Sequence, residues 1–139
     1  MRVFLYFVGR PKDRNLNAVA EDYLARCARY VRCEMREVQP ARFDLQARHP
    51  SAVRILLDPG GALLDSAAFT QLVAKAEMEG RDLVFALGGA DGLPASWRAA
   101  GDMRLSLSPL TFPHEMARAM LAEQLYRAFT TLRGHPYPR

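Results

Sequence analysis

Residues 106–115, with the sequence SLSPLTFPHE, form a segment whose backbone could bind a ligand. Pro109 and Pro113 each fix a φ angle and favour extended geometry in the preceding residue, so this backbone cannot form a helix or a strand ladder. Its N–H and C=O groups still require hydrogen-bond partners. A flat heteroaromatic ring, paired at its edge with these groups and enclosed by neighbouring leucine and phenylalanine side chains, would supply them. The alternative is a rigid connector in which Pro113 opens the next helix.

A glycine-rich turn, GGADG at residues 88–92, is the second candidate binding element. Because glycine has no side chain, Gly88 and Gly89 let the backbone approach a flat group closely. The spacing does not fit the dinucleotide fingerprint G-x-G-x-x-G, and the sequence contains no Walker-type G-x-x-x-x-G-K-[ST] motif. The chain therefore lacks a recognisable phosphate-binding loop. The alternative is a tight strand-to-helix turn with Asp91 as the helix cap.

Hydrophobic periodicity predicts the elements that hold these segments, because apolar runs alternate with helical patterns along the chain. The predicted strands are residues 2–9, 34–39, 53–58, 82–89 and 103–108. The predicted helices are residues 15–31, 66–76 and 113–133, with a short helix within residues 90–101. Residues 40–52 contain turn-forming residues and predict a loop with one short helical turn. The third strand is expected to stop at Pro59.

Strands that alternate with helices predict an α/β fold with a mostly parallel sheet flanked by helices. Ligands of such sheets bind beyond the carboxyl ends of the strands. The loops after Leu57, Leu87 and Leu107 are therefore the expected binding loops. At 139 residues with 50% hydrophobic composition, the chain has the size and apolar content of one domain, residues 1–139.

Charge and cysteine content restrict the class of protein. The formal net charge is +4, and arginine carries most of the excess because only two residues are lysines. This balance is compatible with a polyanionic partner or with an ordinary solvated surface. Cys27 and Cys33 lack the short spacing of a zinc or redox pair, so we expect reduced structural thiols and a cytoplasmic protein. The first apolar run, residues 3–8, is too short for a secretory signal or a membrane span.

Three ordered segments resemble one enzyme family: VFALGGADGL (84–93), SLSPLTFPHEMARAMLAEQLYRAF (106–129) and HPY (135–137). Together they are similar to the small single-domain SPOUT methyltransferases, specifically those that methylate a pseudouridine in 23S ribosomal RNA of the large subunit. The resemblance implies a trefoil-knotted α/β fold, the cofactor S-adenosylmethionine, no metal and a homodimer. It implies methylation of N3 of a pseudouridine in the assembled ribosome. The apolar stripe of the last helix, from Met116 to Leu132, and the first helix offer area for the dimer partner.

The family's site residues are carried over to the matching positions of this chain. The resemblance implies that the cofactor is bound by Leu57, Gly89, Ser108, Pro109, Leu110, Thr111, Phe112 and Pro113. It also implies that the C-terminal RGHPYPR enters the active site, with His135 and Tyr137 as the candidate catalytic residues. His135 could instead close the last helix, Tyr137 could simply pack, and His114 is expected to be structural. Pro138 stands where the family usually has a histidine.

Arginines are the expected RNA contacts, since the lysine-rich insert that the family commonly has between the second and third strands is short here. One group follows the first strand and consists of Arg10, Lys12 and Arg14. A second group surrounds the end of the first helix and consists of Arg26, Arg29, Arg32 and Arg36. The second group could equally complement the helix dipole. Pro138 and the short insert leave open a rival function, a non-catalytic ribosome- or RNA-binding module that keeps the fold.

Overall fold

The computed structural model describes residues 1–137, in which strands and helices alternate. The strands are β1 (Arg2–Phe7), β2 (Arg32–Glu37), β3 (Val53–Leu63), β4 (Leu83–Leu87) and β5 (Met103–Ser106). The helices are α1 (Arg14–Cys27), α2 (Leu45–Arg48), α3 (Ser66–Met78), α4 (Ala95–Ala100) and α5 (His114–Leu132). A 3₁₀ turn, Pro40–Arg42, precedes α2. The alternation predicted from the sequence is confirmed.

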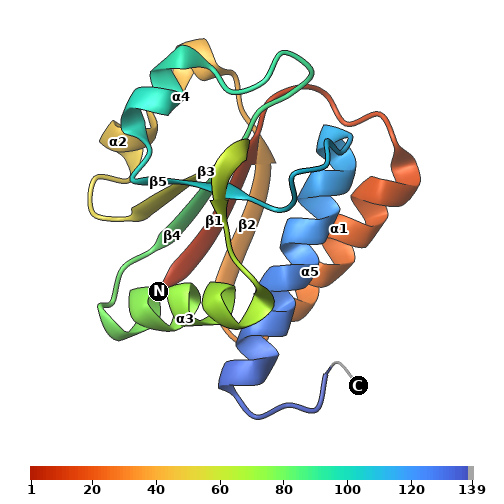
Figure 1. The fold of residues 1–139 in the computed structure, drawn as a ribbon, viewed down its shortest axis with the longest axis vertical. Coiled ribbons are helices and arrows are strands. Elements are labelled where there is room, and N and C mark those ends of the chain that lie inside the picture. Colours follow the sequence, from red (N-terminus) through yellow and green to blue (C-terminus); the bar gives the residue numbers. More distant parts are fainter. Residues whose placement is uncertain (138–139) are drawn as a thin grey trace.

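The five strands are parallel and lie in the order β2-β1-β4-β3-β5 (Figure 1). All five residues of β4, LVFAL, are buried. A strand that is covered on both faces must be apolar throughout, which explains this continuous run. The register places Phe7, Leu87 and Leu57 side by side on three neighbouring strands at the carboxyl edge.

Helices cover both faces of the sheet. Helices α1, α3 and α5 pack on one face, in a core that includes Leu5 and Phe129. Helices α2 and α4 cover the other face, in a core that includes Tyr6 and Trp97. Neighbouring residues of β1 serve different cores because successive side chains of a strand point to opposite faces. Figure 1 shows α1 and α5 side by side along the first face.

Strand β3 is longer than the sequence predicts. We expected it to stop at Pro59, but it continues to Leu63 because its second part pairs with β5. The register shifts after Leu57, so the residues that follow bulge out of the ladder. At Gly61, a Cβ atom would lie 2.6 Å from the backbone of Arg104, so this close pairing requires glycine.

Several other boundaries also differ from the prediction, usually by one or two residues at an element's end. Residues 40–52 contain the 3₁₀ turn and also α2, because Asp44 caps that short helix by accepting a hydrogen bond from the N–H of Ala47. Helix α1 ends at Cys27 rather than at residue 31. Strand β5 ends at Ser106 rather than at Ser108, and the Ser106 hydroxyl donates a hydrogen bond to the C=O of Ser108. The trefoil knot stays a prediction from the resemblance.

The apolar stripe of α5 is only partly available to a partner. Leu121 and Phe129, like most residues of the stripe, are fully buried in the chain's own core. Met116 and Met120 remain 39% and 36% exposed. The prediction that the whole stripe offers area for a dimer is wrong, because the sheet face beneath α5 already covers most of it.

Candidate active site

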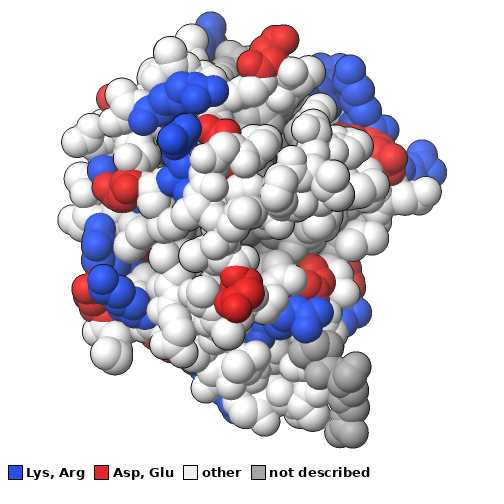
Figure 2. Space-filling model, viewed as in Figure 1, with Lys and Arg blue, Asp and Glu red and all other residues white. Residues whose placement is uncertain are grey.

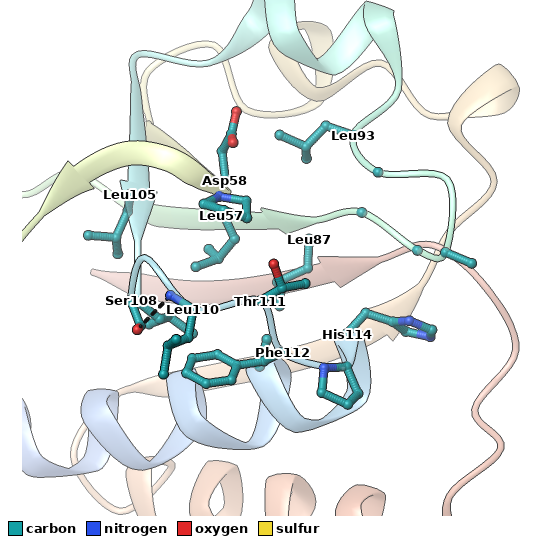
Figure 3. Close-up of a pocket in the computed structure, with 18 of the residues that line it drawn as sticks. Leu57, Asp58, Leu87, Leu93, Leu105, Ser108, Leu110, Thr111, Phe112 and His114 are labelled. Atoms are coloured by element: carbon teal, nitrogen blue, oxygen red, sulfur yellow. Dashed lines mark hydrogen bonds between the residues drawn. The ribbon is translucent and has the colours of Figure 1, made fainter.

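A cavity of about 360 Å³ opens at the carboxyl edge of the sheet (Figure 3). One side is formed by the ends of β3 and β4 with the turn and helix that follow, through Leu57, Asp58, Pro59, Leu87, Gly88, Gly89, Ala90, Gly92, Leu93 and Arg98. The other side is formed by the chain from β5 into α5, through Leu105, Leu107, Ser108, Leu110, Thr111, Phe112, Pro113, His114 and Ala117. Cavities of this size hold small organic ligands.

Most of the residues expected to bind the cofactor lie around this cavity. The lining includes Leu57, Gly89, Ser108, Leu110, Thr111, Phe112 and Pro113. Pro109 is the exception, since it is exposed and does not line the cavity. Three segments that are distant in the sequence therefore meet at the edge where parallel sheets bind ligands.

Serine hydroxyls form hydrogen bonds with part of the backbone of the proline-containing loop. The hydroxyl of Ser106 donates to the C=O of Ser108 at 2.9 Å, and the N–H of Leu110 donates to the Ser108 hydroxyl at 3.0 Å. These two backbone groups therefore have serine partners, whereas the sequence interpretation assigned a ligand to that role. Thr111 and Phe112, in contrast, make no backbone hydrogen bond to any residue of the described chain. Their N–H and C=O groups are therefore available to a ligand.

The glycine-rich turn is held by close backbone contacts. A Cβ atom on Gly88 would lie 2.4 Å from the carbonyl carbon of Gly92. The N–H of Gly92 donates to the C=O of Gly89 at 3.0 Å, and Gly92 has a φ of 81°, which favours glycine. The alternative in which Asp91 caps the next helix is wrong, because Pro94 is the N-cap of α4. The turn therefore exposes backbone without side chains to the cavity, through Gly88, Gly89 and Gly92.

Two charged side chains that sequence reasoning missed, Asp58 and Arg98, also line the cavity. The Asp58 carboxylate accepts hydrogen bonds from the N–H of Gly60 at 2.9 Å and from Nη1 of Arg104 at 3.1 Å. Nη1 of Arg98 lies 3.7 Å from the same carboxylate. The Gly60 hydrogen bond and then the two guanidinium groups hold the pKa of Asp58 below its usual range. The only available signal was an acidic residue directly after an apolar strand.

The loop is also a rigid connector, as the alternative prediction proposed. Pro113 is the N-cap of α5, which has no side-chain cap, and its C=O accepts from the N–H of Ala117 at 3.0 Å. His114 and Ala117 then present one side of this first turn to the cavity. The fixed φ of Pro113 therefore ties the direction of the helix to the cavity wall.

The candidate catalytic residues lie away from the cavity in the same chain. His135 and Tyr137 follow α5, whose C-terminal end is opposite the cavity edge (Figure 1). The Tyr137 hydroxyl donates to Oε2 of Glu123 at 2.6 Å, and its ring centroid is 4.6 Å from that of Tyr126. Burial, with the Glu123 hydrogen bond, raises the pKa of Tyr137 above its usual range. The predicted role of Pro138 lies outside the described residues.

Metal and membrane features can be assessed for residues 1–137. In this part of the chain, no group of three or more His, Cys, Asp or Glu side chains is placed to hold a metal ion. Cys27 and Cys33 are free thiols, as expected. None of the helices described above is both long enough and apolar enough to cross a membrane.

Comparison with known proteins identifies the family to which this fold and cavity belong. A family model described as "Predicted SPOUT methyltransferase" matches residues 1–138. The chain belongs to the SPOUT methyltransferase family. This SPOUT methyltransferase is 62% identical over 139 residues to the "Ribosomal RNA large subunit methyltransferase H" of Solibacter usitatus (strain Ellin6076), with both chains covered in full. The protein of the same name from Sorangium cellulosum (strain So ce56) is 48% identical over 143 residues, covering 99% of each chain.

Solved structures share the fold of this SPOUT methyltransferase at low sequence identity. A probable methylase family protein from Haemophilus influenzae Rd KW20 has a TM-score of 0.61 and 11% identity, over 99% of this chain and 70% of that chain. The SpoU methyltransferase AviRb from Streptomyces viridochromogenes, solved with the cofactor AdoMet, has a TM-score of 0.53 and 12% identity, over 92% and 58% of the two chains. These similarities confirm the predicted fold class.

Proposed function

We propose that this SPOUT methyltransferase transfers a methyl group from S-adenosylmethionine to N3 of a pseudouridine in 23S rRNA of the assembled ribosome. The observation that carries the proposal is the cavity that gathers Leu57, Gly89 and most of residues 108–113. The name of the S. usitatus relative supports a large-subunit rRNA substrate, and the AdoMet bound to AviRb supports the methyl donor. A ribosomal substrate implies that the protein acts in the cytoplasm.

The residues around the cavity fit this cofactor. Leucine and phenylalanine side chains supply apolar walls, and the unbonded backbone groups of Thr111 and Phe112 suit the edge of an uncharged adenine ring. Asp58 and Arg98 supply one carboxylate and one guanidinium, which suit the ammonium and carboxylate groups of the methionine part. S-adenosylmethionine has no phosphate groups, in agreement with the lack of a phosphate-binding motif in the sequence.

The chain contributes mainly alignment and desolvation. Bound S-adenosylmethionine supplies a methyl group that a nitrogen nucleophile can take by in-line displacement. The rigid loop between Pro109 and Pro113 fixes one wall, and the leucines at the ends of β3 and β4 exclude water from the other. Such positioning is worth several orders of magnitude in rate. The proton on N3 must also leave, which requires a nearby base or water.

We assign this proton transfer to the C-terminal segment of a second copy of the chain. Helix α5 has 19 residues, so about 28 Å separates its two ends. His135 and Tyr137 of one chain are therefore too far from that chain's own cavity. His135 is exposed, and its Nδ1, which accepts from the N–H of Tyr137 at 3.2 Å, is the ring nitrogen whose lone pair can take a proton once this contact opens. Tyr137, with its raised pKa, is a hydrogen-bond donor rather than the base.

Exposed apolar side chains on α1 and α5 support the homodimer. Val19 of α1 is 44% exposed, and Met116 and Met120 lie one turn apart on α5. Exposed apolar side chains that gather on one surface commonly mark an interface. Because the catalytic candidates come from a second copy, the proposed enzyme requires this association.

One experiment separates the enzyme from the rival binding module. Ribosomes from a strain that lacks this gene are incubated with the purified protein and S-adenosylmethionine, and the 23S rRNA nucleosides are measured by mass spectrometry. The proposal expects one new methylpseudouridine per ribosome. Tight ribosome binding without cofactor binding or a new methyl group would instead support a non-catalytic module.

A further inference from the structure

A buried carboxylate connects the loop after β1 to the first turn of α5. Glu115 is only 8% exposed. Its Oε1 accepts from the N–H of Lys12 at 2.5 Å and from Nδ2 of Asn17 at 3.2 Å, and its Oε2 accepts from the N–H of Asp13 at 2.9 Å. The hydrogen bond from Lys12 is the main cause that lowers the pKa of Glu115 from its usual value. A buried carboxylate needs several such donors, so this contact fixes the loop backbone.

The first turn of α5 therefore contacts the cavity on one side and the loop after β1 on the other. His114 and Ala117 line the cavity. Glu115 and Arg118, each one residue further on, face the loop after β1 and the start of α1. Positions i and i+3 share a helix face, which explains the pairing. Figure 1 shows the chain passing from β1 to α1 beside the N-terminal end of α5.

Arg118 extends the connection to β1. Its side chain is 1% exposed, and its guanidinium lies 3.6 Å from the ring centroid of Phe7, the last residue of β1. Nη2 of Arg118 donates to Oδ1 of Asn17, and Nδ2 of the same asparagine donates to Oε1 of Glu115. The opposite charges of Glu115 and Arg118 lie in one buried network, so each reduces the cost of burying the other.

The loop held by Glu115 is basic and faces outward; Lys and Arg side chains project at the upper right edge of the molecule in Figure 2, where Figure 1 shows the chain between β1 and α1. We name residues 9–14 the basic loop; it contains Arg10, Lys12 and Arg14, with Asp13 as its single acid. These three cations are exposed, and none forms an ion pair within residues 1–137. The Asp13 carboxylate accepts from the N–H of Leu16, so it caps α1. Unpaired cations on a fixed loop suit a polyanion.

The basic loop begins beside the glycine-rich turn of the cavity. The N–H of Val8 donates to the C=O of Leu87 at 3.3 Å. A Cβ atom on Gly89 would lie 2.9 Å from the carbonyl oxygen of Val8. The chain thus enters the basic loop in contact with one wall of the cavity, and Glu115 fixes its far end to the opposite wall.

From this geometry we infer that Glu115 is a positioning residue, which holds the basic loop against the cavity so that Arg10, Lys12 and Arg14 contact RNA phosphates beside the target nucleotide. The inference rests on the proposed rRNA substrate. Glu115 does not touch the cofactor or the substrate; it acts through the loop. If Glu115 has a purely structural role and only joins α5 to α1, the effect of Glu115→Gln on ribosome affinity should not depend on the loop charges.

Affinity for ribosomes tests the inference without relying on methyl transfer. Three variants are compared with the full chain: Glu115→Gln, a loop variant carrying Arg10→Ala, Lys12→Ala and Arg14→Ala, and their combination. We expect each of the first two to raise the Kd for 70S ribosomes about tenfold, while the Kd for S-adenosylmethionine changes less than about twofold. The combination should be no weaker than the loop variant alone, because Glu115 acts only through those charges. The loop variant should also lower the salt dependence of binding, by a slope of about 2 to 3.

The outcomes separate this inference from the proposed function. Unchanged ribosome affinity in Glu115→Gln, or independent effects that multiply in the combination, overturn the inference even if the wild type methylates ribosomes. A wild type that transfers no methyl group, yet loses ribosome affinity in Glu115→Gln, overturns the proposed function alone. The matched controls are Glu79→Gln, an exposed carboxylate at the end of α3, and Lys75→Ala, an exposed lysine of the same helix that belongs to neither group of expected RNA contacts.

Amide hydrogen exchange supplies a readout that needs no ribosome. The N–H groups of Lys12 and Asp13 should exchange slowly in the wild type and about tenfold faster in Glu115→Gln, because their acceptors are removed or altered. The N–H of Leu16, which donates to Asp13, should keep its rate. If Lys12 and Asp13 exchange at the rate of unbonded amides in the wild type, the positioning role of Glu115 is wrong.

Discussion

The Ser108 hydroxyl accepts a 3.0 Å hydrogen bond from the N–H of Leu110, within the loop that lines the cavity (Figure 3). The same residue's C=O accepts from the hydroxyl of buried Ser106 at 2.9 Å. Two serine side chains thus set the path of the backbone between the end of β5 and Thr111. The position of this cavity wall therefore depends on hydrogen bonds within the loop itself.

The first prediction concerns this internal contact. Ser108→Ala removes the acceptor for Leu110 and loosens the loop, so we expect the Kd for S-adenosylmethionine to rise about tenfold, or ~1.4 kcal/mol. Isothermal titration calorimetry measures this change. Ser96→Ala, on the exposed surface of α4, is the control and should bind as the wild type does. Equal affinities in all three proteins would show that the contact is irrelevant to the site.

The second prediction concerns the glycine-rich turn. Gly88→Ala places a Cβ atom 2.4 Å from the backbone of Gly92, so the turn must open and deform the cavity. We expect a lower Tm and loss of measurable S-adenosylmethionine binding. Gly60→Ala is the matched control, because its Cβ atom meets only Asp58 Oδ1 at an ordinary 3.5 Å. Normal cofactor affinity in Gly88→Ala would exclude the turn from the binding site.

The third prediction concerns the C-terminal segment. Tyr137→Phe removes the hydroxyl that bonds Glu123 but keeps the ring against Tyr126. We expect single-turnover methyl transfer to slow by about 10²-fold or more while the Kd for S-adenosylmethionine is unchanged, since loss of one hydrogen-bond donor from an active site costs a factor of this size. Tyr30→Phe, a half-buried tyrosine at the end of α1, is the control. A Tyr137→Phe enzyme with wild-type rates would leave Tyr137 with a packing role only.

The fourth prediction concerns pH. The pKa of Asp58 is lowered in the folded chain, so its carboxylate adds stability that is present above the ordinary aspartate pKa of about 3.9 and is lost as pH falls through the folded value. Asp58→Asn should be less stable than the wild type at pH 7, because Arg98 and Arg104 then lack their shared carboxylate. Its stability should also fall less on acidification.

Urea unfolding at pH 7 and near pH 3 checks this fourth prediction. The difference in free energy of unfolding between Asp58→Asn and the wild type should shrink at the lower pH. A constant difference at both values would mean that the Asp58 carboxylate contributes nothing that depends on its charge.

The fifth prediction concerns the proposed dimer. A charge at Met120, on the exposed side of α5, must be desolvated on association, so Met120→Lys should shift sedimentation toward the monomer and abolish methyl transfer while S-adenosylmethionine still binds. Met78→Lys is the matched control, because Met78 is 87% exposed at the end of α3. A Met120→Lys protein that stays dimeric would place the interface elsewhere.

Local features of the sequence were sufficient for the order of elements and for most of the cavity. The continuous apolar run of β4 and the two prolines around residues 110–112 are local signals, because an apolar run and a fixed φ angle can be read from neighbouring residues alone. Parallel strands place their carboxyl ends at one edge, so the loops after Leu57, Leu87 and Leu107 could be expected to meet. The individual cofactor residues came from family resemblance.

Long-range pairing decided the rest. The extension of β3 to Leu63 depends on its ladder with β5, and the Asp58–Arg98 contact depends on where α4 packs. The hydrogen bond from Lys12 to Glu115 joins residues 103 positions apart. The length of α5 separates His135 from the cavity of its own chain. Periodicity and composition describe each segment by itself, whereas these contacts exist only after distant segments have packed together.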